Sequence, residues 1–136
     1  TTEIYTLSLH DALPICFILV NFANPDMVGH TGVIEAATKA CKVVDECVGK
    51  IANKCREKGV TMLLTADHGN AEMMVDESTG KPQTAHTTNM VPFVVINPDH
   101  KIELKSDGAL CNVAPTVLEL LGIKQPKEMD AESLIK

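Results

Sequence analysis

The chain has 136 residues, of which 45% are hydrophobic and 3% aromatic, and its formal net charge is −6. This length suits one modest domain, and the hydrophobic fraction argues against a disordered chain. The dispersed basic residues argue against nucleic acid and anionic membranes as partners, because both bind a basic face. The longest apolar run, residues 13–23, is shorter than the roughly 20 residues that span a bilayer. An aliphatic core with few aromatic side chains favours the buried strands of an α/β protein.

The first half of the chain predicts a strand, a long helix and a second strand. Residues 17–23 (FILVNFA) are an apolar run that ends in an Asn-Pro-Asp turn, which indicates a buried strand. Apolar residues at spacings of three and four predict an amphipathic helix over residues 31–58, and Gly59 can end it. Residues 60–66 (VTMLLTA) predict the second buried strand. This order predicts a right-handed βαβ unit with parallel strands.

The second half predicts shorter elements around a polar loop. They are a strand at 71–75, a turn at 76–80, a loop at 81–89, a strand at 91–96, a helix at 113–121 and a mixed tail at 124–136. Pro92 suggests that the strand at 91–96 begins at an edge or entry position. Pro115 near the first turn of the helix and Gly122 after its end fit the usual places of these residues. We expect the tail to wrap the surface.

Polar residues follow the ends of the predicted strands, where sites in parallel α/β sheets usually lie. Asp26 and His30 follow the first strand, and a helical turn there would put both side chains on one face. Asp67 and His68 follow the second strand, and His86 precedes the third. Two carboxylates and three imidazoles suit Mn²⁺, Zn²⁺ or Mg²⁺, and two such cations suit phosphate chemistry.

Each of these groups also has an ordinary structural explanation. An Asp-x-x-x-His spacing occurs often by chance, Asp67 could cap a helix, and His86 could be a satisfied loop residue. We favour a metal site because the groups recur at three successive strand ends. Gly69 would also let the backbone approach a bound group closely.

The other histidines and the cysteines lack such a setting. His100 lies in a Pro-Asp turn and is expected to be solvated. The cysteines are odd in number and have no CxxC spacing, so we expect buried, reduced thiols rather than a disulfide framework or a zinc–thiolate site. They are Cys16, Cys41, Cys47, Cys55 and Cys111.

Four segments are distinctive as whole motifs. They are residues 21–32 (NFANPDMVGHTG), 64–72 (LTADHGNAE), 84–87 (TAHT, followed by VPF at 91–93) and 108–122 (GALCNVAPTVLELLG). Together they resemble the cofactor-independent phosphoglycerate mutase family, from about residue 16 to the end of the chain. The first segment separates this family from other alkaline-phosphatase-like metalloenzymes.

The resemblance implies an isomerase that interconverts 3-phosphoglycerate and 2-phosphoglycerate through a phosphoserine intermediate. It implies two Mn²⁺ ions, with Mg²⁺, Co²⁺ or Zn²⁺ as alternatives, and no 2,3-bisphosphoglycerate. It assigns Asp26, His30 and His86 to one metal, and Asp67 and His68 to the other. It also implies an α/β fold, part of an alkaline-phosphatase-like, doubly wound and mainly parallel sheet with flanking helices. A cytoplasmic, glycolytic monomer is expected, with phosphoglycerate as its substrate.

The chain departs from the family pattern at its start. Residues 1–15 (TTEIYTLSLHDALPI) do not resemble the family, and we expect an artefactual leader, with a divergent native leader as the alternative. The phosphatase-like domain then occupies residues 16–136. The family's nucleophilic serine is expected upstream, so the chain supplies no nucleophile and should be inactive alone. Asn24 is expected to orient the loop of the first metal.

Two other interpretations stay open. One is another metallohydrolase or phosphomutase of the alkaline-phosphatase superfamily, and the other is a non-catalytic metal-binding remnant. Substrate profiling and Mn²⁺ affinity would separate them from the mutase. A part of the sheet by itself would leave unpaired edges and exposed apolar faces.

Overall fold

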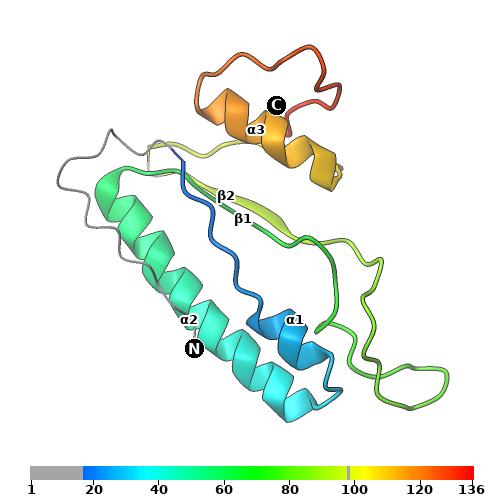
Figure 1. The fold of residues 1–136 in the computed structure, drawn as a ribbon. Helices are drawn as coiled ribbons and strands as arrows, with labels where there is room; N and C mark the ends of the chain where they lie inside the picture. Colours follow the sequence, from blue (N-terminus) through cyan, green and yellow to red (C-terminus); the bar gives the residue numbers. More distant parts are fainter. Residues whose placement is uncertain (1–16, 98) are drawn as a thin grey trace.

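Helices and two strands make up the fold in the computed structural model, which describes residues 17–97 and 99–136 (Figure 1). In chain order the elements are α1 (Asn24–Gly29), α2 (Ile34–Lys58), β1 (Met62–Thr65), β2 (Phe93–Ile96), η1 (Leu110–Asn112) and α3 (Val113–Leu120). Across this described part, no helix is both long and apolar enough to cross a membrane. The predicted leader at 1–15 lies outside the described residues.

The long amphipathic helix is confirmed as α2, and α1 packs against it. Ala37 and Ala52 are the buried residues of α2, and their small side chains permit close packing on that face. Gly59 ends the helix with φ at +67°, a left-handed conformation that glycine adopts without steric cost. The amide of Val60 then donates to the carbonyl of Cys55 at 2.9 Å, which completes the cap.

The strand predicted at residues 17–23 is wrong. The segment is a coil that leads into α1, and the side chains of residues 17–20 are between 55% and 84% exposed. A strand needs a partner for its backbone groups, and among the described residues the sheet contains only β1 and β2. The parallel βαβ unit is therefore also wrong here, whereas the expected exposure of an apolar face is confirmed.

Strands β1 and β2 pair antiparallel, with Met62 opposite Ile96 and Thr65 opposite Phe93. Isolated bridges continue this pairing outward, from Gly69–Thr87 to Val75–Pro82. Residues 62–96 therefore form one long, interrupted hairpin. The strand expected at 71–75 is reduced to its bridge at Val75.

The predicted turn at 76–80 closes this hairpin. The Oδ1 atom of Asp76 accepts bonds from the amide of Ser78 at 2.8 Å and from its hydroxyl at 2.6 Å. These bonds hold the pKa of the Asp76 carboxyl below its usual value, and the bond from the Ser78 hydroxyl contributes most. Gly80 supplies a φ of +65°, and its amide donates to the Asp76 carbonyl at 2.7 Å.

The hairpin ladder is interrupted between its two parts. Residues 66–68 separate the paired Thr65 from Gly69 on one arm, whereas residues 88–92 separate Thr87 from Phe93 on the other. The longer arm contains Pro92, which has no N–H to donate to a ladder. The arms therefore part at this level. Two predicted ligands lie beside the break, because His68 precedes Gly69 and His86 precedes Thr87.

The predicted C-terminal helix is confirmed as α3, with Pro115 and Thr116 fully buried. Gly122 follows it with φ at +66°. The tail does more than wrap the surface, because Leu134 is 7% exposed and its amide donates to the Thr116 hydroxyl at 2.9 Å. That hydroxyl donates in turn to the carbonyl of Asn112 at 2.7 Å. One buried hydroxyl thus joins α3 to the end of the chain.

The thiols and His100 lie mainly at the surface. His100 is exposed, as predicted. Cys41 and Cys111 are exposed, and Cys47 and Cys55 are half-buried, so the prediction of buried thiols is wrong for the first two. Three of these cysteines belong to α2, much of whose surface faces solvent. All four are free, and Cys16 lies outside the described residues.

The Thr116 hydroxyl gives a test of how the tail is anchored. We expect Thr116→Val to lower the free energy of unfolding by about 1–3 kcal/mol, because the Leu134 amide would lose its buried acceptor. Thr116→Ser keeps the hydroxyl and should cost less, about the 0.8 kcal/mol of one methyl group. Urea denaturation of both variants measures the difference. A serine variant as unstable as the valine variant would contradict this account.

Candidate metal centre

Helix α1 brings Asp26 and His30 onto one face, as their spacing predicts. Pro25 occupies the first turn of α1, and the amide of His30 donates to the Asp26 carbonyl at 3.1 Å. The side chains of residues i and i+4 of a helix are neighbours. Here the Nε2 atom of His30 lies 3.2 Å from Oδ1 of Asp26.

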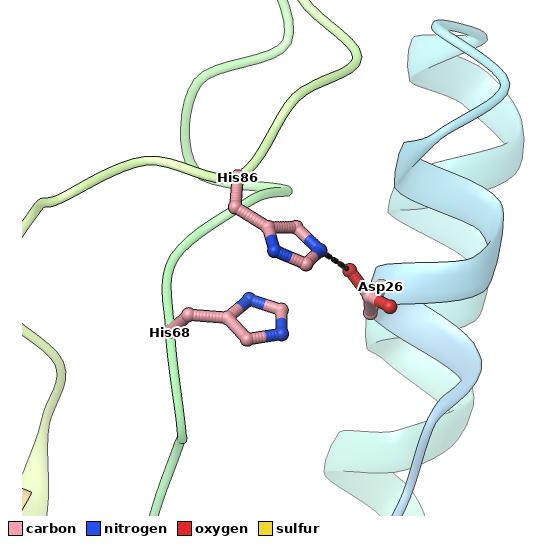
Figure 2. Close-up of side chains that lie close together, drawn as sticks. All are labelled: Asp26, His68 and His86. Atoms are coloured by element: carbon pink, nitrogen blue, oxygen red, sulfur yellow. Dashed lines mark hydrogen bonds and ion pairs between the residues drawn. The ribbon is translucent and has the colours of Figure 1, made fainter.

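His86 reaches this pair from the far arm of the hairpin. Its Nε2 atom lies 3.0 Å from Oδ1 of Asp26 and 3.1 Å from Nε2 of His30. Figure 2 shows the His86 ring pointing at the Asp26 carboxylate. Three donor atoms thus form a nearly equilateral triangle with sides of 3.0–3.2 Å.

A carbonyl group fixes which nitrogen of His30 faces this triangle. The Nδ1–H group of His30 donates to the carbonyl of Thr84 at 2.6 Å, which leaves a lone pair on Nε2 in the neutral ring. Such a bond on the outer nitrogen is typical of metal-binding histidines. Since Thr84 lies two residues before His86, the same loop both positions His30 and supplies the third donor.

The donor triangle fits a divalent cation. Asp26 Oδ1 and His30 Nε2 are both acceptors, and the Nε2 of a neutral His86 brings at most one proton to the group. Ligands at right angles, each about 2.1 Å from an ion, are about 3.0 Å apart, and tetrahedral ligands are about 3.4 Å apart. The observed sides lie nearer the first value. Oxygen and imidazole nitrogen donors suit Mn²⁺, Mg²⁺, Co²⁺ or Zn²⁺.

His68 joins the same cluster, whereas Asp67 does not. The rings of His68 and His86 stack with centroids 3.7 Å apart and planes 20° apart (Figure 2). Ligand atoms of Asp26, His68 and His86 all lie within 4.8 Å of one another. The side chain of Asp67 is 87% exposed, and its Oδ2 lies 3.7 Å from Nε2 of His68. This second set of ligand atoms shares Asp26 and His86 with the donor triangle. One cluster therefore contains all the predicted ligands except Asp67.

A buried amide missed by the sequence analysis orients Asp26. The Nδ2 group of Asn70, a residue 5% exposed, donates to Oδ1 of Asp26 at 3.1 Å. Asn70 Oδ1 is buried, lacks a hydrogen-bond partner among the described residues and lies against Gly29. A buried acceptor without a partner costs about 1–3 kcal/mol. Asn24 is exposed in the first turn of α1, so the amide beside Asp26 is not the predicted one.

A second missed residue is Glu72, whose carboxylate lies between the two arms of the hairpin. It accepts hydrogen bonds from the Thr87 hydroxyl, from Nδ2 of Asn89 at 3.0 Å and from the amide of Asn70 at 2.6 Å. The Thr87 bond contributes most to holding the pKa of Glu72 below its usual value. The segment 64–72 contains both Asn70 and Glu72, but no spacing rule distinguishes them from loop residues.

The contact between Gly29 and Asn70 can be tested with a matched glycine. A Cβ atom at Gly29 would collide with the Asn70 carboxamide, so Gly29→Ala should destabilise the fold by about 1–3 kcal/mol. Gly49 lies within α2 with no neighbour inside 4 Å, and Gly49→Ala should stabilise by about 0.5–1 kcal/mol. Urea unfolding measures both. Equal stabilisation by the two changes would show that Asn70 is free to move away.

Comparison with known proteins gives relatives of much greater length. A 2,3-bisphosphoglycerate-independent phosphoglycerate mutase of Clostridium botulinum is 60% identical over 119 residues, which are 88% of this chain and 23% of that protein. The Clostridium kluyveri protein of the same name is 57% identical over the same shares. The chain therefore spans about a quarter of the length of these relatives. The resemblance to this family seen in the sequence motifs is confirmed by these names.

A solved structure is similar as well. It is a crystal structure of Leishmania mexicana phosphoglycerate mutase at low cobalt concentration, matched with a TM-score of 0.75 and 32% identity over 85% of this chain and 24% of that one. This match confirms the α/β, alkaline-phosphatase-like fold class, although the two strands described here pair antiparallel. A family model described as the metalloenzyme superfamily matches residues 6–125, and so overlaps the segment 1–15 predicted to be a leader. The chain belongs to the metalloenzyme superfamily.

Proposed function

We propose that this chain forms part of a phosphoglycerate mutase that interconverts 3-phosphoglycerate and 2-phosphoglycerate without 2,3-bisphosphoglycerate. The observation that carries the proposal is the donor triangle of Asp26, His30 and His86. It joins segments up to 60 residues apart and brings one carboxylate oxygen and two imidazole nitrogens to a single point. The names of the relatives supply the substrate.

The proposed ligand assignment follows the sequence motifs. Asp26, His30 and His86 would hold one metal, and Asp67 and His68 would contribute to a second. Mn²⁺ is our first choice for both, with Mg²⁺, Co²⁺ or Zn²⁺ as alternatives. When bound, such ions neutralise charge on a phosphoryl group and lower the pKa of a hydroxyl nucleophile.

The residues of this chain would act by holding and orienting. The Thr84 carbonyl keeps the proton of His30 on Nδ1, and Asn70 directs Oδ1 of Asp26 toward the two imidazoles. The exposed carboxylate of Asp67 would have to turn to complete the second site. The remaining ligands and the serine of the proposed phosphoserine mechanism would come from other parts of a longer protein, a cytoplasmic, glycolytic monomer.

Two alternatives make different predictions. Another alkaline-phosphatase-like hydrolase or phosphomutase would act on phosphate esters other than phosphoglycerates. A non-catalytic remnant would bind Mn²⁺ weakly or not at all, an outcome favoured by the exposure of Asp67 but not by the donor triangle.

Mn²⁺ binding tests the triangle. Titration of the 136-residue chain with Mn²⁺, followed by the electron paramagnetic resonance signal of the free ion, should detect one site in the parent and none in His86→Ala. His100→Ala is the matched control, because His100 is an exposed histidine that does not belong to the cluster of candidate ligands. It should bind Mn²⁺ as the parent does. Equal binding by the parent and the His86 variant would refute the role of His86.

Turnover tests the reaction. In an assay coupled to consumption of 2-phosphoglycerate, a full-length protein containing this sequence should convert 3-phosphoglycerate, and the 136-residue chain alone should not. Loss of a residue that only contacts a metal ligand typically lowers activity about 10- to 100-fold. Asp26→Asn in the full-length protein alters a proposed ligand itself and should lower the rate by more than that. Turnover by the chain alone would contradict the assignment of the nucleophile to another part of the protein. Hydrolysis of other phosphate esters at a higher rate would favour the hydrolase.

A further inference from the structure

The Glu72 carboxylate accepts hydrogen bonds from three residues of the hairpin. Both of its oxygens are engaged: Oε2 by the amide of Asn70, and Oε1 by the Thr87 hydroxyl and the Asn89 amide group. The outer part of the hairpin is closed independently by the Asp76 turn and the Val75–Pro82 bridge. The Glu72 bonds lie instead at the level of the Gly69–Thr87 bridge, next to the break in the ladder.

These donors come from the two loops that carry the histidines. Asn70 follows His68 by two residues, and Thr87 follows His86 directly. The amide of Thr87 also donates to the carbonyl of Gly69 at 2.9 Å, so the loops are joined by backbone and side chain at one level. This joint lies immediately beside the stacked imidazoles.

The close fit at this joint depends on glycine. A Cβ atom at Gly69 would collide with both the Thr87 hydroxyl and the Glu72 carboxylate. The carboxylate is thus held against the backbone that leads out of His68. A shift of Glu72 would change the separation of the two loops and of their histidines.

Glu72 also acts on the third side chain of the cluster. The backbone amide of Asn70 donates to Glu72, while the side chain of the same residue donates to Asp26. The Glu72 carboxylate is therefore separated from each of Asp26, His68 and His86 by one intervening residue, and it hydrogen-bonds to none of the three. No interaction with substrate is needed for such a role.

We propose that Glu72 is a positioning residue that sets the separation of the His68 and His86 loops and thereby the affinity of the centre for a divalent cation. This inference rests on the metal centre of the proposed function. It assigns to Glu72 an effect on the cation through Asn70 and Thr87, and no direct coordination.

Mn²⁺ affinity of the 136-residue chain tests this role. Glu72→Ala should weaken Mn²⁺ binding by about 10-fold, the lower end of the effect of removing a direct partner of a metal ligand, because Glu72 acts through Asn70 and Thr87. Glu77→Ala is the matched control, since Glu77 is an exposed acid in the turn of the same hairpin, and its affinity should equal that of the parent. With Co²⁺ at saturation, the visible absorption spectrum should change in the Glu72 variant and stay unchanged in the Glu77 variant. Mere loss of stability would lower the folded fraction without changing the spectrum of the folded protein.

A second pair of variants serves if Glu72→Ala does not fold. Thr87→Val removes one donor to Glu72 with little change of shape, and Thr87→Ser restores it. The valine variant should weaken Mn²⁺ binding and the serine variant should recover it. In a chain that folds with both changes, the combined effect should be smaller than the sum of the two single effects, because the bond between Thr87 and Glu72 can be lost only once.

The outcomes separate this inference from the proposed function. Parent-like Mn²⁺ affinity and an unchanged Co²⁺ spectrum in Glu72→Ala, or in Thr87→Val where the first variant is unfolded, would overturn the positioning role alone. Additive effects of the two changes would overturn it as well. A folded parent that binds no Mn²⁺ would overturn both proposals, since Glu72 would then have no centre to position.

Discussion

Antiparallel pairing of the two arms of residues 62–96 is the constraint on which the centre depends. The pairing that joins β1 to β2 is interrupted once, resumes in a shifted register and extends toward the turn at Asp76. That pairing returns the chain to the neighbourhood of His68 and delivers His86 beside it. Helix α1 then needs only to present Asp26 and His30 to a histidine already in place. Without the return of the second arm, the donor triangle would lack its third donor, His86.

The interruption of the ladder is as important as the ladder itself. A regular hairpin would pair the residues of both arms with one another and leave little freedom to the loops. The two arms have different lengths at the break, and Pro92 in the longer arm cannot donate to a ladder. Side-chain bonds connect the arms beside this break, among them the bond from Nδ2 of Asn89 to Glu72, and the backbone amide of Asn89 donates to the Thr87 hydroxyl. A local irregularity of the sheet therefore creates room for a cluster of polar side chains.

The sequence predicted the elements whose causes are local. The period of apolar residues identified α2, and Gly59 and Gly122 ended their helices as expected. The spacing of Asp26 and His30 anticipated their approach because one helical turn is sufficient to produce it. The choice of His86 as their partner depended on the motif, and the structure brings the three side chains together.

The remaining errors concern interactions between distant parts of the chain. An apolar run such as residues 17–23 indicates a strand only if other backbone is available to pair with it, and the run does not specify that partner. The roles of Asn70 and Glu72 depend on Asp26 and Thr87, residues 44 and 15 positions away. Periodicity and spacing contain no information of that kind. Asp67 shows the converse, since its motif predicts a ligand while its side chain points into solvent.

The most direct test of the account is to locate a bound ion. Crystals of the chain grown with Mn²⁺ can be measured by anomalous X-ray scattering, which identifies the metal independently of the protein density. The account predicts an anomalous peak bonded to Oδ1 of Asp26 and to the Nε2 atoms of His30 and His86. A peak elsewhere, with these three atoms still hydrogen-bonded to one another, would contradict it.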